Sequence, residues 1–236
     1  MYYTKFRPSR NSGIGVRRII MVNKANSDVN TKYVVGSGVS YTPIAIRHQL
    51  QRRANNFANG NIGDDKFIVR SGKGEYLGGS GRDIFEFTGG TNNYANGQLG
   101  NDTIRLYAGQ GTYLGGDDSD FFEVLASEAG SKVNGNKGKD TITGKANITY
   151  RGGSDNDRIA VSQGLVYGDK NADRFVGVKG DGYAVIQDYT IGEDVVEITM
   201  NGSWSKIDSG LLFTDDSGDQ IMLLLGVNEI EQMTLI

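Results

Sequence analysis

The chain has 236 residues and no cysteine, so neither disulfide bonds nor a cysteine zinc site can stabilise its fold. Glycine is abundant (35 residues) while proline is nearly absent (2 residues), which argues against a collagen-like or disordered chain. No apolar run approaches the roughly 18 residues of a membrane span, and no apolar stretch follows the charged N-terminus as in a cleavable signal peptide. We therefore expect no transmembrane segment.

The net charge of −3 conceals two oppositely charged parts. Residues 1–56 carry ten basic residues and one acidic residue, whereas the remaining 180 residues carry 15 basic and 27 acidic residues. A basic head on an acidic body indicates two parts with different partners.

Residues 1–41 contain strand-like pieces at 18–22 and 32–35 among Gly, Ser and Asn. We expect an extended basic arm that docks on a neighbouring molecule, with Arg17 and Arg18 as candidate partner contacts.

Residues 42–57 begin with Thr42 and Pro43, a favourable N-cap and first-turn pair. The apolar spacing that follows predicts an amphipathic capping helix over about 43–56, with Ile44, Ile46, Leu50 and Phe57 on its buried side. The basic residues left outside are Arg47, Arg52 and Arg53. They form either a surface for an acidic partner, such as a polysaccharide, a lipid head group, nucleic acid or another subunit, or a solvated helix face.

From residue 58 to about 180 one pattern repeats seven times. An aspartate recurs at intervals of 18, 19, 18, 20, 17 and 16 residues, at Asp65, Asp83, Asp102, Asp120, Asp140, Asp157 and Asp173. Five residues before each aspartate stands a glycine: Gly60, Gly78, Gly97, Gly115, Gly135, Gly152 and Gly168. Two residues after each aspartate stands Phe or Ile. Such a fixed period is the signature of a repeat architecture whose units bury their apolar faces by stacking.

The chemistry of the unit predicts a parallel β-solenoid. Gly, Asn and Asp between the glycine and the aspartate favour a tight turn, because they tolerate positive φ. The residues after the aspartate alternate between apolar and polar, as in Phe85 and Phe87 against Ile84 and Glu86, which predicts a short strand. A second apolar position, seven residues before each aspartate, completes a coil of turn, strand, turn and strand. We expect about seven coils stacked at ~4.8 Å.

The run GGSGRDIFE (78–86) fits the nonapeptide GGxGxDxUx, in which U is a large apolar residue. In this the chain resembles the RTX (hemolysin-type) calcium-binding repeats over about residues 57–200. The resemblance implies a right-handed parallel β-roll that holds calcium in the turns between coils.

The same resemblance makes the seven aspartates carboxylate ligands, with turn carbonyls from adjacent coils completing each calcium site. The best turns end at Asp65, Asp83, Asp102, Asp120 and Asp157, and begin at Gly60, Gly78, Gly97, Gly115 and Gly152. Lys137 and Lys139 flank Asp140, and the turn before Asp173 departs from the motif. The second half-turns, such as 71–77 and 108–114, lack the aspartate, so we expect calcium along one edge only. The alternative is a metal-free solenoid in which each aspartate bonds to its own backbone.

Residues 181–236 should form a C-terminal cap. Leu211–Val227 reads as a hairpin around Asp215–Gly218, and Trp204 and residues 233–236 should cover the last coil. RTX proteins exported by type I secretion carry an uncleaved C-terminal signal, and this tail is compatible with one. On the outside of the roll, Glu86, Arg105 and Glu123 should form a ladder of alternating charge.

No catalytic arrangement stands out, because the single histidine, His48, has no nucleophile motif beside it. We therefore expect a non-enzymatic calcium-binding protein with an extracellular structural or adhesive role, exported by a non-classical or type I route. The alternative is an assembly subunit, such as a virion decoration, tail component or filament protomer, that self-associates or docks through residues 1–41. A third possibility is the carrier module of a secreted enzyme. An acidic polysaccharide or surface is a candidate partner, and no specific nucleic acid is expected.

Overall fold

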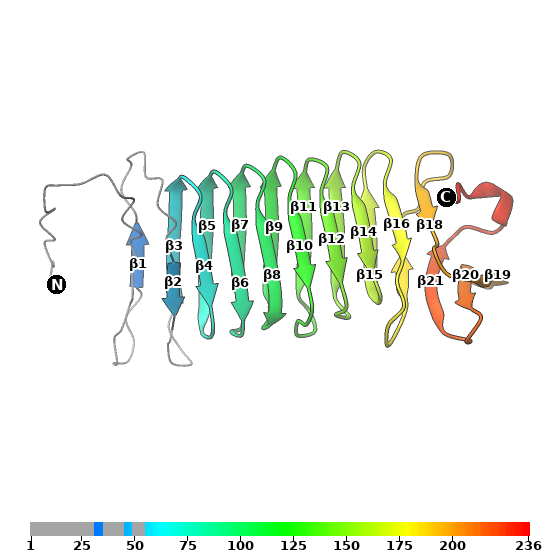
Figure 1. Ribbon diagram of the computed structural model, residues 1–236, viewed down its shortest axis with the longest axis horizontal. Helices are drawn as coiled ribbons and strands as arrows, with labels where there is room; N and C mark the ends of the chain where they lie inside the picture. The colour runs from blue at the N-terminus through cyan, green and yellow to red at the C-terminus, as the bar shows by residue number, and fades with distance from the viewer. Residues whose placement is uncertain (1–30, 35–44, 49–54) are drawn as a thin grey trace, which may run out of the picture.

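The computed structural model describes residues 31–34, 45–48 and 55–236 of the chain. Two β-sheets face one another along an elongated stack of about eight turns, and the chain advances from one end to the other (Figure 1). This confirms the predicted all-β solenoid of parallel coils. No helix in the described ranges has the length and apolar character that a membrane crossing requires.

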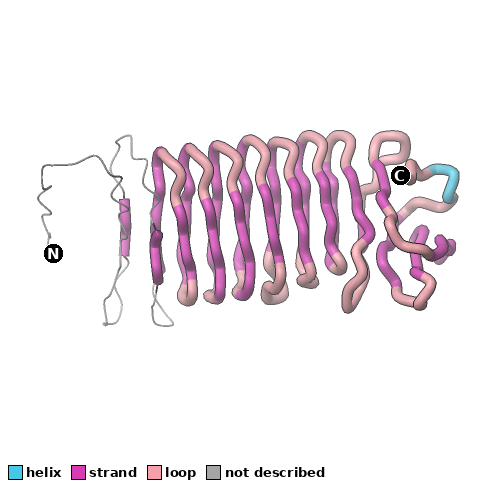
Figure 2. Tube along the Cα trace, viewed as in Figure 1, coloured by secondary structure: helices cyan, strands magenta, loops and turns pink. Residues whose placement is uncertain are grey.

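Each coil contributes one strand to each sheet (Figure 2). Sheet A comprises, in spatial order, β18 (Val195–Glu197), β16 (Arg174–Gly177), β14 (Arg158–Val161), β12 (Thr141–Gly144), β10 (Phe121–Val124), β8 (Thr103–Ala108), β6 (Ile84–Thr88), β4 (Lys66–Val69) and β2 (Ala45–His48). Sheet B comprises β1 (Thr31–Val34), β3 (Asn55–Ile62), β5 (Lys73–Ser80), β7 (Asn93–Leu99), β9 (Gly111–Asp117), β11 (Lys132–Lys137), β13 (Thr149–Ser154), β15 (Gly164–Asp169), β17 (Ala184–Ile186), β21 (Gln220–Leu225), β20 (Gly210–Asp215) and β19 (Gly202–Ile207).

Equivalent residues of successive coils stack in register, so each inward position becomes a column. In sheet A, Phe67 pairs with Phe85 and Phe85 pairs with Ile104, and all three side chains are fully buried. The Phe67 and Phe85 rings are stacked with their centroids 4.5 Å apart. Burying such a side chain contributes roughly 1.5–3 kcal/mol, so the columns are the main source of stability.

The inward column of sheet B alternates between small and large residues. It runs Ala58, Tyr76, Ala95, Tyr113, Val133 and Tyr150. The three tyrosines lie 37 residues apart, which is the length of two coils. Each large ring therefore has a small neighbour above and below it, and the packing unit of this part of the solenoid is a pair of coils.

The predicted capping helix over about 43–56 is wrong. Ala45–His48 forms strand β2, which pairs in parallel with β4 and places Ile46 opposite Phe67. A further strand, β3, begins at Asn55. Pairing to the next coil supplies hydrogen bonds along the whole edge of the sheet, and this overrides a weak local preference for helix. Thr31–Val34 of the expected arm likewise forms β1, which pairs with β3.

The predicted C-terminal cap is confirmed. Strands β20 and β21 form an antiparallel hairpin around Asp215–Gly218, and β21 extends sheet B beyond β17. Trp204 packs against this hairpin, with its ring 5.3 Å from that of Phe213. A short 3-10 helix, η1 (Ile230–Gln232), precedes the tail, and Leu235 bridges to Val196 at the outer side of β18.

Candidate functional site: the aspartate column

The turns that lead from sheet B to sheet A lie along one side of the solenoid, here called the aspartate edge. In each of them the residues one and three positions after the first glycine have positive φ. Gly, Asn or Asp occupies all of these positions except Gln98, as the sequence predicts. Where the first of these residues is Asn61, Gln98 or Asn136, its N–H donates to the Oδ1 of an asparagine two residues earlier.

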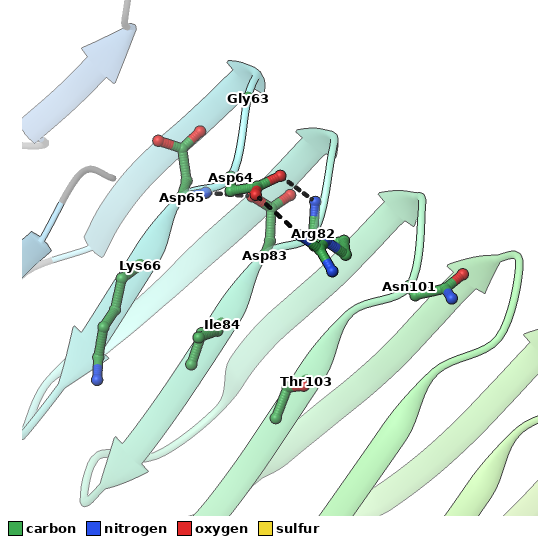
Figure 3. A pocket seen from close by; sticks show the side chains of 9 residues that line it. All are labelled: Gly63, Asp64, Asp65, Lys66, Arg82, Asp83, Ile84, Asn101 and Thr103. Atoms are coloured by element: carbon green, nitrogen blue, oxygen red, sulfur yellow. Dashed lines mark hydrogen bonds and ion pairs between the residues drawn. The ribbon is translucent and has the colours of Figure 1, made fainter. Parts of the chain in front are cut away.

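The seven predicted aspartates come together in one row, here called the aspartate column. The backbone N–H of each aspartate donates to Oδ1 of the aspartate in the next coil, at 2.6–2.9 Å. Figure 3 shows the first two members, Asp65 and Asp83. The side chains therefore bond to the backbone of a neighbouring coil rather than to their own, and they connect the coils one by one.

The position of the second carboxylate oxygen, Oδ2, explains why a glycine recurs five residues before each aspartate. A Cβ on Gly97 would overlap with Oδ2 of Asp102 and with the carbonyl oxygen of Gly115 in the next coil. The same relation holds at the six repeats from Gly60 to Gly152, whereas a Cβ on Gly168 would meet Oδ2 of Asp173 and the ring of Phe175 instead of a carbonyl oxygen. Each of these six turns thus brings a carboxylate oxygen and a backbone carbonyl oxygen to the same side of a bare glycine.

These carboxylates are deeply buried, with only 1–4% of each residue exposed. In the described part of the chain, Oδ2 has no hydrogen-bond partner in Asp83, Asp102, Asp120, Asp140 and Asp157. Burial raises the pKa of these carboxyl groups to about 7 in Asp83 and Asp140 and to about 8 in Asp102, Asp120 and Asp157. The backbone N–H that each carboxylate accepts opposes this shift, and nearby carboxylates raise the pKa further: members of the column for Asp83, Asp102, Asp120 and Asp157, and Asp155 for Asp140.

The column has an eighth member that the sequence pattern does not reveal. This member is Asp194. Its Oδ1 accepts the N–H of Asp173 at 2.9 Å, and its Oδ2 accepts the N–H of Thr190 at 2.7 Å. Tyr189 stands where the glycine of the motif would be, so the search for Gly–Asp pairs misses it. The signal that could have found it is the apolar Val196 two residues later, which is fully buried. With both oxygens accepting N–H groups, Asp194 terminates the column.

The two turns that depart from the motif keep the same hydrogen bonds along the column. Asp140 accepts the N–H of Asp120 at 2.7 Å, and Asp173 accepts that of Asp157 at 2.9 Å. Lys137 points away from Asp140 and pairs with Asp117 on the outside, at 3.1 Å. The lysine therefore does not neutralise the buried carboxylate beside it.

The opposite side of the solenoid, here called the second edge, is built differently. All buried carboxylates among the described residues belong to the aspartate column and its terminator Asp194. The buried polar side chains of the second edge are neutral: Asn56, Asn93, Ser131 and Ser162. The two edges therefore differ in charge, as the absence of aspartate from the second half-turns predicts.

Outside the column, charged side chains form the predicted ladder on sheet A. Arg105 lies between Glu86 and Glu123, at 3.9 and 3.1 Å, and Lys66 pairs with Glu86 at 2.7 Å. A shallow groove follows the first three turns beside this ladder (Figure 3). These side chains remain partly open to solvent, so each pair is worth no more than about 1 kcal/mol.

Of the basic residues predicted to contact a partner, only Arg47 falls within the described residues, on strand β2 opposite Ile68. Arg17, Arg18, Arg52 and Arg53 lie outside them, as does most of the expected arm.

The donor set of the column suits a hard cation in its chemistry, since it consists of carboxylate and carbonyl oxygens. No three acidic, His or Cys side chains within the described ranges converge on one point. Any metal shell would therefore take a few carboxylate oxygens from the column and the rest from backbone carbonyls or water. In comparisons with known proteins, no protein family and no curated protein matches the chain.

Proposed function

We propose that the protein is a non-enzymatic calcium-binding β-roll with an extracellular structural or adhesive role. The observation that carries this proposal is the row of buried carboxylates, each with one oxygen that has no protein partner in the described structure from Asp83 to Asp157.

Such a row is unfavourable without counter-charge. Two unit charges ~5 Å apart repel by about 1 kcal/mol in water and by several times more at an effective dielectric constant of ~20. Below the raised pKa values the aspartates retain protons and do not repel one another, whereas above those values they ionise and a cation is needed to neutralise them. One Ca²⁺ neutralises two carboxylates, and it prefers the hard oxygen ligands that the column provides.

Calcium would be held between adjacent coils. Its ligands would be Oδ2 atoms of the aspartate column together with the carbonyl oxygens of the glycines that begin the turns, as in the Asp102–Gly115 pair. When bound it would supply positive charge and cross-link successive coils. The second edge has no buried carboxylates in its described residues, so calcium is proposed for the aspartate edge alone.

Calcium would also link folding to location. A site with a Kd of ~10⁻⁴–10⁻³ M stays empty at cytosolic calcium levels and fills outside the cell. A rigid rod of this kind, stabilised only after export, fits a structural or adhesive role.

Calorimetric titration of calcium into the chelator-treated protein tests this proposal. The Asp102→Asn variant should bind fewer ions than the wild type, because asparagine has the shape of the carboxyl group without its charge. The Asp155→Asn variant is the matched control, since it removes an exposed charge two residues before Asp157. An absence of calcium binding by the wild type, or equal stoichiometry in Asp102→Asn, would contradict the proposal.

The charge asymmetry of the chain favours a second proposal, an assembly subunit in which the solenoid is a spacer and the basic N-terminal part contacts neighbours. Sedimentation of the full chain and of a chain without residues 1–30 distinguishes the two. Assembly that depends on these residues would support the subunit, whereas unchanged sedimentation of the shortened chain would count against it.

A further inference from the structure

Two clusters of neutral polar groups are buried inside the second edge. Asn56 and Asn93 are 5% and 3% exposed, and Tyr76 and Tyr113 are fully buried. In the described structure, neither the amide groups of the two asparagines nor the hydroxyls of the two tyrosines have a hydrogen-bond partner. Six polar groups without partners in an apolar core would cost several kcal/mol, so they need an explanation.

The two clusters are copies of one arrangement. In each, an asparagine at the start of a sheet B strand is followed 20 residues later by a tyrosine of the next coil, and the copies are 37 residues apart. The glycine two residues before each tyrosine leaves space for its ring: a Cβ on Gly74 would lie 2.5 Å from the Tyr76 hydroxyl, and one on Gly111 would lie 3.0 Å from the Tyr113 ring. Both hydroxyls therefore lie inside the edge of the roll.

The asparagine and the tyrosine of each cluster are neighbours without being bonded. Burial raises the pKa of Tyr76 to about 12 and also raises that of Tyr113, while Asn56 and Asn93 respectively oppose the shift. Each asparagine thus lies near its hydroxyl, yet neither pair has hydrogen-bond geometry. Two neighbouring polar groups that do not meet hydrogen-bond geometry with one another can be bridged by a water molecule.

The third repeat shows that the chain satisfies these positions itself where it can. Ser131 occupies the position of the asparagines, and its hydroxyl donates to the carbonyl oxygen of Glu128 at 2.8 Å. The Tyr150 hydroxyl donates to the carbonyl oxygen of Ala146, also at 2.8 Å. The missing partners of the first two repeats are therefore specific to them and are not a general property of the second edge.

We propose that each of the two clusters binds one ordered water molecule, between Asn56 and Tyr76 and between Asn93 and Tyr113. A buried water makes about three hydrogen bonds, and each cluster offers it the tyrosine hydroxyl and one end of the asparagine amide. Water matches this set because it both donates and accepts. A cation suits the clusters less well, because no carboxylate is buried there to neutralise its charge.

A crystal structure at a resolution that defines ordered solvent tests the proposal directly. We expect one solvent peak in each cluster, within hydrogen-bond distance of the tyrosine hydroxyl and the asparagine amide, and none beside Tyr150. A direct hydrogen bond between Asn93 and Tyr113, with no solvent peak, would overturn it.

Magnetic relaxation dispersion of water ¹⁷O, which counts long-lived internal waters, is an independent test in solution. The Tyr113→Phe variant should lose one such water and the Tyr76→Phe/Tyr113→Phe variant should lose two. The Tyr150→Phe variant is the control and should lose none, because its hydroxyl bonds to Ala146. An unchanged count in the double variant would refute the proposal, whatever the calcium experiments show.

Discussion

The glycine and the aspartate of each repeat act together as one structural unit. The carboxylate packs against the bare Cα of the glycine five residues earlier, and its Oδ1 binds the backbone N–H of the preceding coil. The spacing in the sequence predicts that the two residues belong to one turn. It does not reveal that the carboxylate points inward, because that depends on the N–H group that the neighbouring coil presents.

Replacing a repeat glycine by alanine should be costly although its φ is ordinary. In Gly97→Ala the new methyl group would overlap with Asp102 and Gly115, and overpacking of this kind typically costs about 1–3 kcal/mol. Gly218→Ala is the control: its φ is 90°, but a Cβ there meets nothing within 4 Å, so about 1 kcal/mol is expected. Chemical denaturation should rank the two in this order. A Gly218→Ala variant less stable than Gly97→Ala would contradict the packing of the turn.

The buried carboxyl groups should make stability depend on pH when calcium is removed. Burial raises the pKa of Asp102 to about 8 from its ordinary value of 3.8, so the folded chain binds more protons than the unfolded chain between these pH values. The free energy of unfolding should therefore be largest below about pH 4 and fall as the pH rises toward 8, by up to about 1.4 kcal/mol per pH unit for each such group.

Urea denaturation in chelator at pH 5 and pH 8 measures this dependence. The Asp102→Asn variant should lose less stability than the wild type over this range, because its amide cannot ionise, and at pH 8 it should be the more stable protein. Excess calcium should flatten the wild-type dependence. A wild-type stability that rises from pH 5 to pH 8 in chelator would contradict the burial of the column.

At the scale of elements, each strand is positioned by pairing with the neighbouring coil, which places its inward residues in the stacked columns. The alternation after each aspartate predicts the sheet A strands correctly, and the Asp215–Gly218 turn predicts the C-terminal hairpin. Residues 45–48 show where sequence reasoning fails: AIRH fits either one turn of an amphipathic helix or one short strand, and only pairing with β4 decides between them. Asp194 was missed for a related reason, because its place in the column is set by stacking rather than by the local motif.

Phe87 of strand β6 should be among the most sensitive core positions. Its ring makes edge contacts with Tyr76 and Tyr113, at centroid distances of 5.7 and 4.8 Å, and so joins two coils of sheet B. We expect Phe87→Ala to lower the free energy of unfolding by about 3–5 kcal/mol. Leu125→Ala, at a side chain that is 44% exposed, should change it by less than about 1 kcal/mol. Similar losses in the two variants would show that the column is not tightly packed.

At the scale of the whole molecule, the alternation of tyrosine with alanine or valine makes a pair of coils the unit that can be removed. Deletion of residues 77–113 joins Tyr76 to Leu114 and keeps the order of large and small residues. Deletion of residues 77–95 removes one coil and stacks Tyr76 on Tyr113. The larger deletion should therefore leave the more stable protein, with a single cooperative thermal transition. The reverse order of melting temperatures would show that the alternation has no role in packing.

The repeat also explains which parts of the molecule the sequence can predict. Seven repetitions make the register, the two inward columns and the aspartate column evident. A chance match in one repeat does not alter the pattern that the other six share. The two ends of the solenoid do not repeat. The structure of the first coil and the place of Asp194 in the column therefore depend on tertiary contacts that the sequence period does not predict.

Thermal melting in calcium and in chelator, at a pH near 7.5, tests the proposed calcium role most directly. If calcium neutralises the aspartate column, a concentration of 100 times Kd stabilises the fold by about 2.7 kcal/mol per site. The melting temperature should then rise by several degrees in the wild type and by less in Asp102→Asn, with magnesium having a weaker effect. Identical midpoints in calcium and in chelator would remove calcium from the function of this protein.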